Sequence, residues 1–496
     1  MKYKHGIFLG MLFLAVFFIR LYFAFQTPYF AEDDAYFTLR QVEHIRQTGL
    51  PLYEDPLSYG GRQYLFLPSF HYVLAFFSLF MPTVVALKVI PNLFATSLII
   101  PVFMIINLIT RKENIAFLGG LISAFIPVFV FETTNTASVY TLALPLIVLL
   151  MYFFIRINTT KDPKWFIIFF VLLLLTDTSS LFLVFAILLY LVFAWSEGLD
   201  IKRGEIELAI FSLFITVLFY IFFFRDALML HGPSIIYGNL PDMLLDNYFA
   251  VLNISESLIN IGIVPLLSAI FVSFVYFSRR KKKSVYLPMS SCFIIAVMLA
   301  FRLIPILLGL IYLGVMCTIL FGEFFNYIIE YFEKTKFSKL KWTVYVLLII
   351  VVVITSMVPS IWGTYALSKN QENFNTIEIL KIIPDITDNR TTIAAPPESG
   401  HLITYFAEQK NVLDSNYLFV ENIENRFKEL EQIYTSAVAS KPLEIMEKNN
   451  IEYILLNEQV KEDYNITRLS YASNRCFPVV ISYNETKIYK RRCSLV

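Results

Sequence analysis

Long apolar runs separated by short polar stretches dominate the chain from residue 1 to about residue 362. The hydrocarbon core of a membrane is roughly 30 Å thick, so a helix needs about 20 apolar residues to cross it. A helix suits this environment because its backbone groups are satisfied within the segment. Eleven runs fit or approach this length: 7–25, 84–109, 115–132, 138–155, 164–176, 181–195, 206–224, 258–278, 285–301, 303–331 and 342–362. The pattern therefore predicts a multi-span α-helical membrane protein with about eleven transmembrane helices.

The pattern changes at about residue 370, where charged residues return. Short apolar stretches at 392–395 and 453–456 are typical of strands, whereas 423–434 and 443–449 have the periodicity of amphipathic helices. We therefore predict a transmembrane domain over residues 1–362 and a soluble α/β domain over residues 363–496.

The composition supports a membrane protein. Of the 496 residues, 57% are hydrophobic and only 16% are charged, which is too much apolar surface for one soluble core. The formal net charge of +1 argues against a nucleic-acid partner. Cys476 and Cys493 lie in the polar tail, and the sequence leaves open whether they pair.

Basic residues gather in alternate loops, among them Arg111, Lys112 and the run 279–283. Loops rich in Lys and Arg face the cytoplasm in most membrane proteins. We therefore expect a multi-pass protein of the cell membrane with a cytoplasmic N-terminus. The loops 26–83 and 225–257 and the C-terminal domain would then be extracytoplasmic.

The loop after the first apolar run places three carboxylates in a row, at Glu32, Asp33 and Asp34. At the membrane surface such a group can serve as a general base or a metal ligand toward a lipid-borne substrate. Alternatively it is structural, because an acidic residue at the start of the helix predicted from Ala35 would satisfy free N–H groups and the helix dipole. The spacing alone leaves both interpretations open.

Two segments carry a family resemblance. The segment from Glu32 to Arg40 resembles the E-x-D-P-[YW]-F-x-x-R loop of the catalytic subunit of oligosaccharyltransferase, including its archaeal relatives, with Ala35 in place of the proline. Residues 297–303, VMLAFRL, resemble the family's V-M-V-R-L. Aspartate-containing loops after a first span also occur in the protein mannosyltransferase and lipid A aminoarabinose transferase branches of the same GT-C superfamily.

The resemblance implies a GT-C type membrane glycosyltransferase whose catalytic first outer loop is 26–83. Asp34 and Asp33 would be the catalytic residues, with Asp34 also a metal ligand. Arg302 and Arg40 would bind the phosphate of the donor. An arginine within a membrane is costly without a partner, and its planar fork of donors matches a phosphate. The alternative for Arg302 is that it extends to the outer membrane interface.

The chain departs from the family at the second acidic motif. Where that family completes its metal site with a D-x-E type motif, this chain has Val139 and Thr141. Glu132 is the carboxylate nearest to these positions in the sequence, and it would either replace the missing ligand or simply cap the loop.

A second departure lies in the tail. In place of the family's W-W-D-Y-G acceptor motif, the chain reads PPESGH over residues 396–401. We predict an acceptor-side role for Glu398 and His401. Helix capping before residues 401–409 is the alternative explanation of this segment.

These features favour an enzyme that moves a sugar or oligosaccharide from a polyprenyl or dolichyl phosphate-linked donor to an extracytoplasmic acceptor, either a glycan or a protein. The resemblance implies a divalent cation, Mn or Mg, with a metal-independent base mechanism as the alternative. A non-catalytic paralogue that binds or assembles glycan machinery would explain both departures. A transporter or flippase is disfavoured, because the carboxylates crowd the outer loops and not the middle of the spans.

Overall fold

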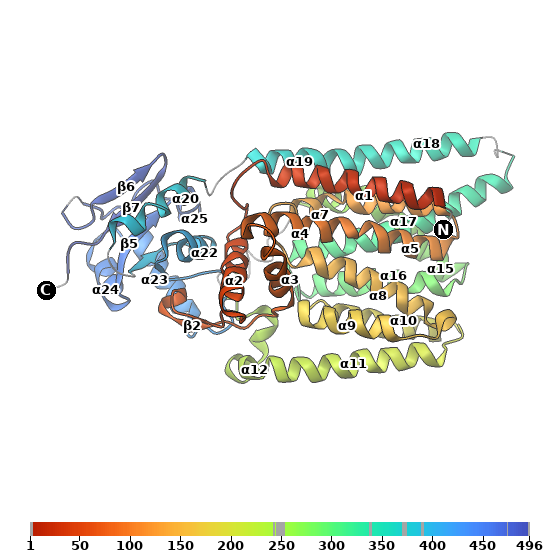
Figure 1. Cartoon of the computed structure of the whole chain (residues 1–496), viewed down its shortest axis with the longest axis horizontal. Coiled ribbons are helices and arrows are strands. Elements are labelled where there is room, and N and C mark those ends of the chain that lie inside the picture. Colours follow the sequence, from red (N-terminus) through yellow and green to blue (C-terminus); the bar gives the residue numbers. More distant parts are fainter. Residues whose placement is uncertain are drawn as a thin grey trace.

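The computed structural model describes residues 3–241, 244, 253–336, 340–369, 374–387, 391–473 and 475–494. Figure 1 shows a long helical bundle with a sheet-containing domain at one end. The N-terminus lies at the opposite end of the bundle, and the C-terminus lies on the far side of the sheet domain.

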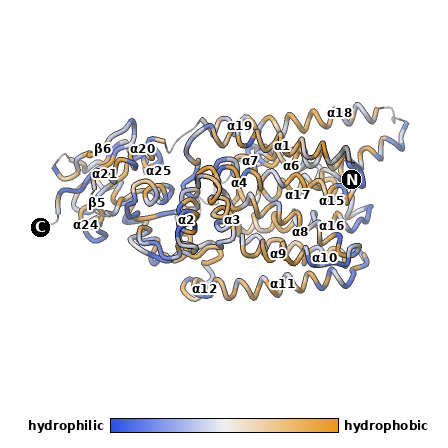
Figure 2. Tube along the Cα trace, in the orientation of Figure 1, coloured by the Kyte–Doolittle hydropathy of each residue, from blue (hydrophilic) through white to orange (hydrophobic). Residues whose placement is uncertain are grey.

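Every apolar run predicted from the sequence forms helix, but the runs 115–132 and 258–278 are each divided between two helices. The bundle consists of α1 (Tyr3–Ala24), α4 (Thr83–Ser97), α5 (Ile99–Thr110), α6 (Glu113–Ala124), α7 (Pro127–Phe131), α8 (Tyr140–Thr160), α9 (Lys164–Thr176), α10 (Ser180–Ser196), α11 (Arg203–Phe223), α14 (Ile254–Ile261), α15 (Ile263–Ser278), α16 (Lys283–Ala300), α17 (Ile306–Lys334), α18 (Lys341–Val352), the π-helical turn η4 (Val353–Met357) and α19 (Val358–Lys369). Among the described residues, seven helical spans are long and apolar enough to cross a membrane, with α4 and α5 counted together and α18 to α19 counted together. Figure 2 shows hydrophobic positions throughout this bundle.

The other predicted spans are shorter or broken. The helices α6, α9 and α10 have 12, 13 and 17 residues. The predicted continuous span 258–278 is wrong, because α14 and α15 meet at an angle of 84°. Gly262 lies at this break with φ of 92°, a conformation that glycine adopts without a steric penalty.

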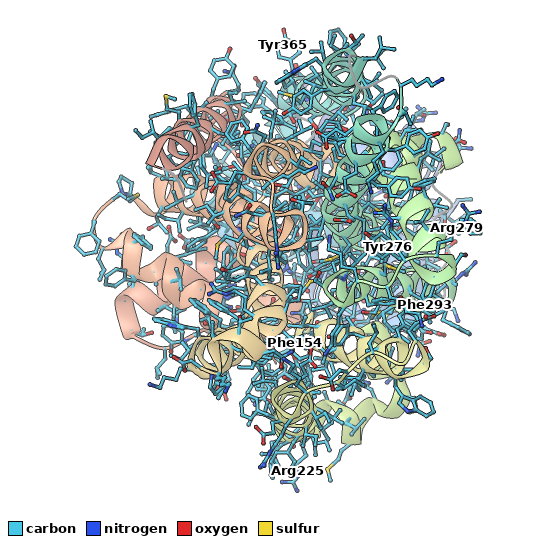
Figure 3. All side chains as sticks on the ribbon, turned by 90° about the vertical axis from the view of Figure 1, so that its right-hand side faces the viewer. Phe154, Arg225, Tyr276, Arg279, Phe293 and Tyr365 are labelled. Atoms are coloured by element: carbon cyan, nitrogen blue, oxygen red, sulfur yellow. A yellow bond between two sulfur atoms is a disulfide. The ribbon has the colours of Figure 1, made fainter. Side chains whose placement is uncertain are left out.

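Apolar side chains also cover the outside of the bundle. Phe214 and Phe222 on α11 are 65% and 72% exposed, and Phe18 on α1 is 62% exposed. Figure 3 views the bundle from the end opposite the sheet domain, with Phe154 among the packed helices and Phe293 on the periphery. Exposed apolar surface on this scale needs a lipid environment. The chain is therefore a multi-pass membrane protein.

The loop 26–83, for which we keep the name first outer loop, folds between the bundle and the sheet domain (Figure 1). It contains α2 (Asp34–Thr48), the strand pair β1 (Glu54–Asp55) and β2 (Arg62–Gln63), the 3-10 turn η1 (Ser58–Gly60) and α3 (Ser69–Ser78). One face of α2 is buried through Ala35, Leu39 and Val42, which follow the helical repeat. Gly49 ends this helix in the left-handed conformation.

The predicted α/β fold of the tail is present as a five-stranded sheet of order β4-β3-β5-β7-β6. Its strands are β3 (Thr392–Ala394), β4 (Lys410–Asn411), β5 (Ile451–Leu456), β6 (Val479–Tyr483) and β7 (Thr486–Lys490). The accompanying helices and turns are α20 (Phe374–Leu380), α21 (Ile383–Ile386), η5 (Pro397–Ser399), α22 (Gly400–Leu402), η6 (Ile403–Ala407), α23 (Ile423–Thr435), α24 (Ser440–Lys448) and α25 (Glu458–Asp463). The open question about Cys476 and Cys493 is answered, because the two form a disulfide.

Candidate functional site

A cavity of about 890 Å³ lies where the bundle, the first outer loop and the sheet domain meet. All three parts contribute to its lining: Asp34 and His71 come from the outer loop, Glu132 and Pro305 from the bundle, and Glu398 and His401 from the sheet domain. Residues of η2 (Gly232–Tyr237), which follows α12 (Arg225–His231), also line it. Cavities between structural units that combine apolar walls with a few polar groups are the usual location of ligand sites.

Asp33 connects the outer loop to the sheet domain. It is 7% exposed, and its carboxylate accepts backbone hydrogen bonds from His401 at 3.0 Å and from Leu402 at 2.7 Å. Its side chain makes no capping hydrogen bond to α2, so the helix-cap alternative is wrong for this residue. Asp33 instead satisfies N–H groups of the PPESGH segment, a fixed structural contact that its predicted catalytic role did not include.

Asp34 is the first residue of α2, and its side chain is exposed to the cavity. The Ser415 hydroxyl donates a hydrogen bond to its Oδ1 at 2.5 Å. The same hydroxyl lies 3.2 Å from Nε2 of His401. Asp33 is therefore buried and held by backbone contacts, whereas Asp34 faces the open cavity.

The contact between the outer loop and the sheet domain is centred on Asp414, which is fully buried. Its carboxylate accepts hydrogen bonds from Arg62 at 2.6 Å, from Tyr64 at 2.9 Å and from Ser58. Burial by itself raises the pKa of Asp414, but the charges of His401 and Arg62 and the hydrogen bonds from Ser58 and from the backbone of Asn416 bring that pKa below its ordinary value. This network holds the sheet domain beside Asp34.

The carboxylates around the cavity influence one another. Desolvation, followed by the charges of Glu132 and Asp34, raises the pKa of Glu32 to about 8. Burial also raises the pKa of Glu398. Crowding of carboxylates in a partly desolvated space is relieved by a bound cation or by positively charged substrate groups.

Three side chains could hold such a cation. Asp33, Asp34 and His401 each offer a ligand atom, and these atoms lie within 4.8 Å of one another. His401 is 1% exposed, and its Nδ1 has no hydrogen-bond partner in the part of the chain that the structure describes. Two carboxylates and an imidazole with a vacant nitrogen fit a divalent cation such as Mn.

The remaining predicted residues differ in where they lie relative to the cavity and to the three-residue group. Glu132, the predicted second metal ligand, lines the cavity but is not in the three-residue group. Glu398 and His401 both line the cavity, as an acceptor-side role requires. Ser399 makes no side-chain cap to α22, so helix capping does not explain that segment.

The two predicted phosphate-binding arginines, Arg40 and Arg302, differ in their surroundings. Arg40 forms a bidentate pair with Asp55, at 2.7 and 2.9 Å, and does not line the cavity. Asp55 thus occupies two donors of the Arg40 guanidinium, and the phosphate contact of Arg40 stays a prediction. Arg302 lies in the loop between α16 and α17, with φ of 54°, three positions before the cavity-lining Pro305.

Sequence reasoning missed Ser415 and the position of His401 next to the aspartates. The distance along the chain explains this, since His401 and Asp33 are 368 residues apart. The only signal was the LDSN stretch at 413–416, which places Ser415 directly after Asp414.

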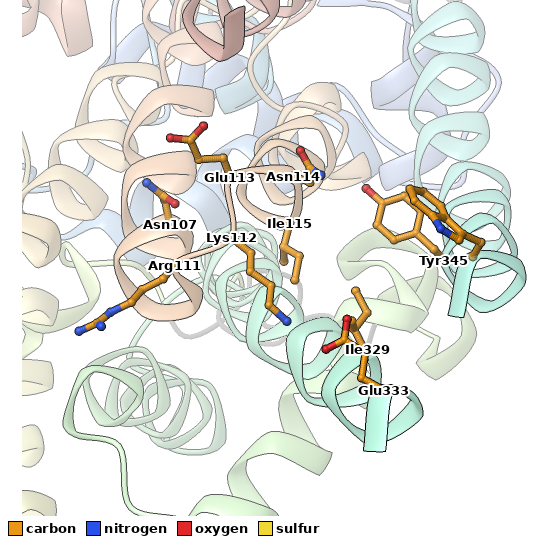
Figure 4. Close-up of a pocket in the computed structure, with 10 residues that line it drawn as sticks. Asn107, Arg111, Lys112, Glu113, Asn114, Ile115, Ile329, Glu333 and Tyr345 are labelled. Atoms are coloured by element: carbon orange, nitrogen blue, oxygen red, sulfur yellow. The ribbon is translucent and has the colours of Figure 1, made fainter. Parts of the chain in front are cut away.

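A second cavity, of about 730 Å³, lies beside the end of α5 and the start of α18, away from the sheet domain (Figure 1). Figure 4 shows its lining side chains in close-up. Its lining comes from α5, α6, α17 and α18 and includes Arg111, Lys112, Glu113, Glu333 and Tyr345. None of the predicted site residues is in this lining.

Comparison with known proteins identifies the fold. No family model matches the sequence, and neither does any curated protein. Solved structures do match: an Archaeoglobus fulgidus oligosaccharyltransferase in complex with zinc and sulfate is 13% identical, with a TM-score of 0.66 over 90% of this chain and 67% of that chain. AglB from Archaeoglobus fulgidus, in complex with an inhibitory peptide and a dolichol-phosphate, is 13% identical, with a TM-score of 0.65 over 92% and 69% of the two chains. ArnT from Cupriavidus metallidurans, bound to undecaprenyl phosphate, is 10% identical, with a TM-score of 0.56 over 99% and 98%.

The chain has the GT-C fold. The expected fold class, a multi-span helical membrane part with an α/β domain, is therefore confirmed. At these identities the likeness concerns the fold. The chemistry of the cavity beside Asp34 follows from the residues of this chain.

Proposed function

We propose that this protein is a membrane glycosyltransferase that acts at the cavity of about 890 Å³ lined by Asp34, here named the Asp34 cavity. It transfers a sugar or oligosaccharide from a polyprenyl or dolichyl phosphate-linked donor to an extracytoplasmic acceptor. One observation carries this proposal: Asp34 is exposed in a large cavity between an apolar bundle and a soluble domain, where lipid-borne and soluble substrates can meet. That two of the solved GT-C structures contain lipid phosphates supports the donor class.

The proposed reaction needs a base and an exit for the leaving group. An oxygen or nitrogen of the acceptor attacks the anomeric carbon, while the bond from that carbon to the phosphate oxygen breaks. The lipid phosphate leaves with the electron pair, and the Asp34 carboxylate accepts the proton of the acceptor. Attack from the side opposite the phosphate inverts the anomeric carbon. The hydrogen bond from Ser415 keeps Asp34 oriented toward the cavity.

The donor phosphate would lie toward the membrane end of the cavity. Arg302 precedes the lining residue Pro305, and we propose that its guanidinium contacts this phosphate. A divalent cation bound beside Asp34 would neutralise the charge that develops on the leaving phosphate. Glu398 lines the same cavity from the sheet domain, which supports the proposal that it acts on the acceptor side.

We also infer that the sheet-domain end is extracytoplasmic. Arg111 and Lys112 directly follow α5 and Arg279 directly follows α15, and both helices end away from the sheet domain (Figure 1). Such basic residues favour the cytoplasmic side. The disulfide between Cys476 and Cys493 is also expected in an oxidising compartment.

The test compares membranes that contain the wild-type protein with membranes that contain Asp34→Asn. Lipid extract of the source cells supplies the donor, and mass spectrometry follows loss of the glycan from the lipid, with and without a chelator. We expect turnover to fall by at least about 100-fold in Asp34→Asn, because a general base contributes roughly this factor.

Glu54→Gln is the matched control, since Glu54 is an exposed carboxylate of the same loop that does not line the cavity. It should turn over donor as the wild type does. Equal turnover in Asp34→Asn and the wild type would contradict the proposed role of Asp34. Donor that is bound but never consumed by the wild type would favour the non-catalytic paralogue.

A further inference from the structure

The group Asp33, Asp34 and His401 joins two parts of the molecule. The aspartates stand at the start of α2 in the first outer loop, whereas His401 belongs to α22 in the sheet domain. Their ligand atoms come within 4.8 Å only because the two parts are docked. A cation held by all three would therefore bridge the docked surfaces.

A second observation concerns the imidazole ring of His401. Its side chain is 1% exposed, its ring packs on Phe37 at 5.2 Å between centroids, and its Nε2 lies 3.2 Å from the Ser415 hydroxyl. Its Nδ1 is buried and has no hydrogen-bond partner within the described ranges. A buried polar nitrogen without a partner is costly and calls for a partner such as a water, an ion or a substrate group.

The same histidine compensates for a missing feature of the sequence. Val139 and Thr141 occupy the positions at which acidic ligands were expected. Neither offers a carboxylate, and the Thr141 hydroxyl donates to the backbone oxygen of Ser138. A cation beside Asp34 would therefore take its further ligands from elsewhere, and the sheet domain offers the imidazole of His401.

We propose that His401 is a metal ligand and that, with Asp33 and Asp34, it binds a divalent transition-metal cation that fastens the sheet domain to the first outer loop. Three protein ligands leave coordination positions for water or for a phosphate oxygen. The imidazole suits Fe or Zn and the two carboxylates suit Mn, whereas Mg retains most of its waters and is disfavoured. The catalytic meaning of this site rests on the proposed function, but metal binding is measurable without turnover.

The experiment uses the purified full-length chain, stripped of metal and reconstituted in lipid nanodiscs. Mn²⁺ binding is measured by electron paramagnetic resonance, and thermal unfolding is recorded with and without Mn²⁺. We expect His401→Ala to weaken Mn²⁺ binding by more than about tenfold, as changes around metal sites typically do. It should also abolish the stabilisation by Mn²⁺, because a cation that binds only the folded state raises its stability.

Two matched controls come from the same cavity. His71→Ala removes a second buried histidine of the lining, and Glu132→Gln removes the carboxylate that the sequence suggested as a ligand. Neither residue is in the three-residue group, so both variants should bind Mn²⁺ as the wild type does. Unchanged Mn²⁺ affinity in His401→Ala, or a larger loss in Glu132→Gln, would overturn the assignment.

A further variant separates ligation from packing. His401→Cys replaces the imidazole with a thiolate, and we expect it to recover binding of Cd²⁺, a soft cation, while Mn²⁺ binding stays weak. A merely structural role would leave the preference between the two cations unchanged. Loss of Mn²⁺ binding in His401→Ala together with no glycosyl transfer by the wild type would uphold the metal site and contradict the proposed function. Normal transfer by the wild type together with unchanged Mn²⁺ affinity in His401→Ala would support the proposed function and contradict the metal site.

Discussion

The two cavities at opposite ends of the bundle are similar in size but differ in construction. The Arg111 cavity, of about 730 Å³, is walled by bundle helices and includes the exposed side chains of Arg111 and Asn114 (Figure 4). The Asp34 cavity, of about 890 Å³, borders on buried polar groups that are hydrogen-bonded across the domain junction. Volume therefore does not distinguish the two. Burial of the polar side chains does: Arg111, Asn114 and Glu333 are exposed, whereas His71 and His401 are buried.

The largest expected effect concerns the buried network beside the Asp34 cavity. Asp414→Ala would leave the Arg62 guanidinium, whose side chain is 7% exposed, without its partner. Removal of one member of a buried ion pair costs about 3–5 kcal/mol. We expect the free energy of unfolding of the sheet domain to fall by this amount, measured by thermal unfolding and by protease sensitivity of the purified protein.

Arg111→Ala provides the comparison at the other end. An exposed side chain outside such a network changes stability by about 0.5 kcal/mol or less. Equal destabilisation by Asp414→Ala and Arg111→Ala would show that the two cavities are not built differently.

A smaller effect concerns pH. The pKa of Glu32 is raised to about 8 in the folded protein, from an ordinary value of 4.5. Folding thus favours its protonated form, and the resulting stability is complete below about pH 4.5 and is lost as the pH rises through about 8. Solvent reduces the size of this effect, because the side chain is exposed to the cavity.

Glu32→Gln should therefore flatten the dependence of the melting temperature on pH over this range. Glu54→Gln, outside the cavity, should leave that dependence as in the wild type. A pH dependence that is identical in Glu32→Gln and the wild type would contradict the electrostatic description of the cavity.

Local pattern was sufficient to predict most of the fold. The apolar runs gave the bundle helices, and the alternation in the tail gave β3, β5, α23 and α24. The break at Gly262 was not predicted, because a single glycine within an apolar run is compatible with both a straight and a bent helix. Periodicity records which residues are apolar, and it does not record the angle between consecutive helices.

The candidate site was predictable only in part. Asp34 was found because a family-like motif surrounds it. The different roles of Asp33 and Asp34 depend on residues 401 and 415, which reach them only through tertiary docking. The occupation of Arg40 by Asp55 was equally hidden, because a sequence shows charges and not which charges are already paired.

The most direct test of the central claim is a cryo-electron microscopy structure of the protein in nanodiscs with dolichyl phosphate and Mn²⁺. The account predicts density for the lipid phosphate in the Asp34 cavity, with Arg302 on its membrane side and the cation between Asp34 and His401. Phosphate density confined to the Arg111 cavity, with the Asp34 cavity empty, would contradict it.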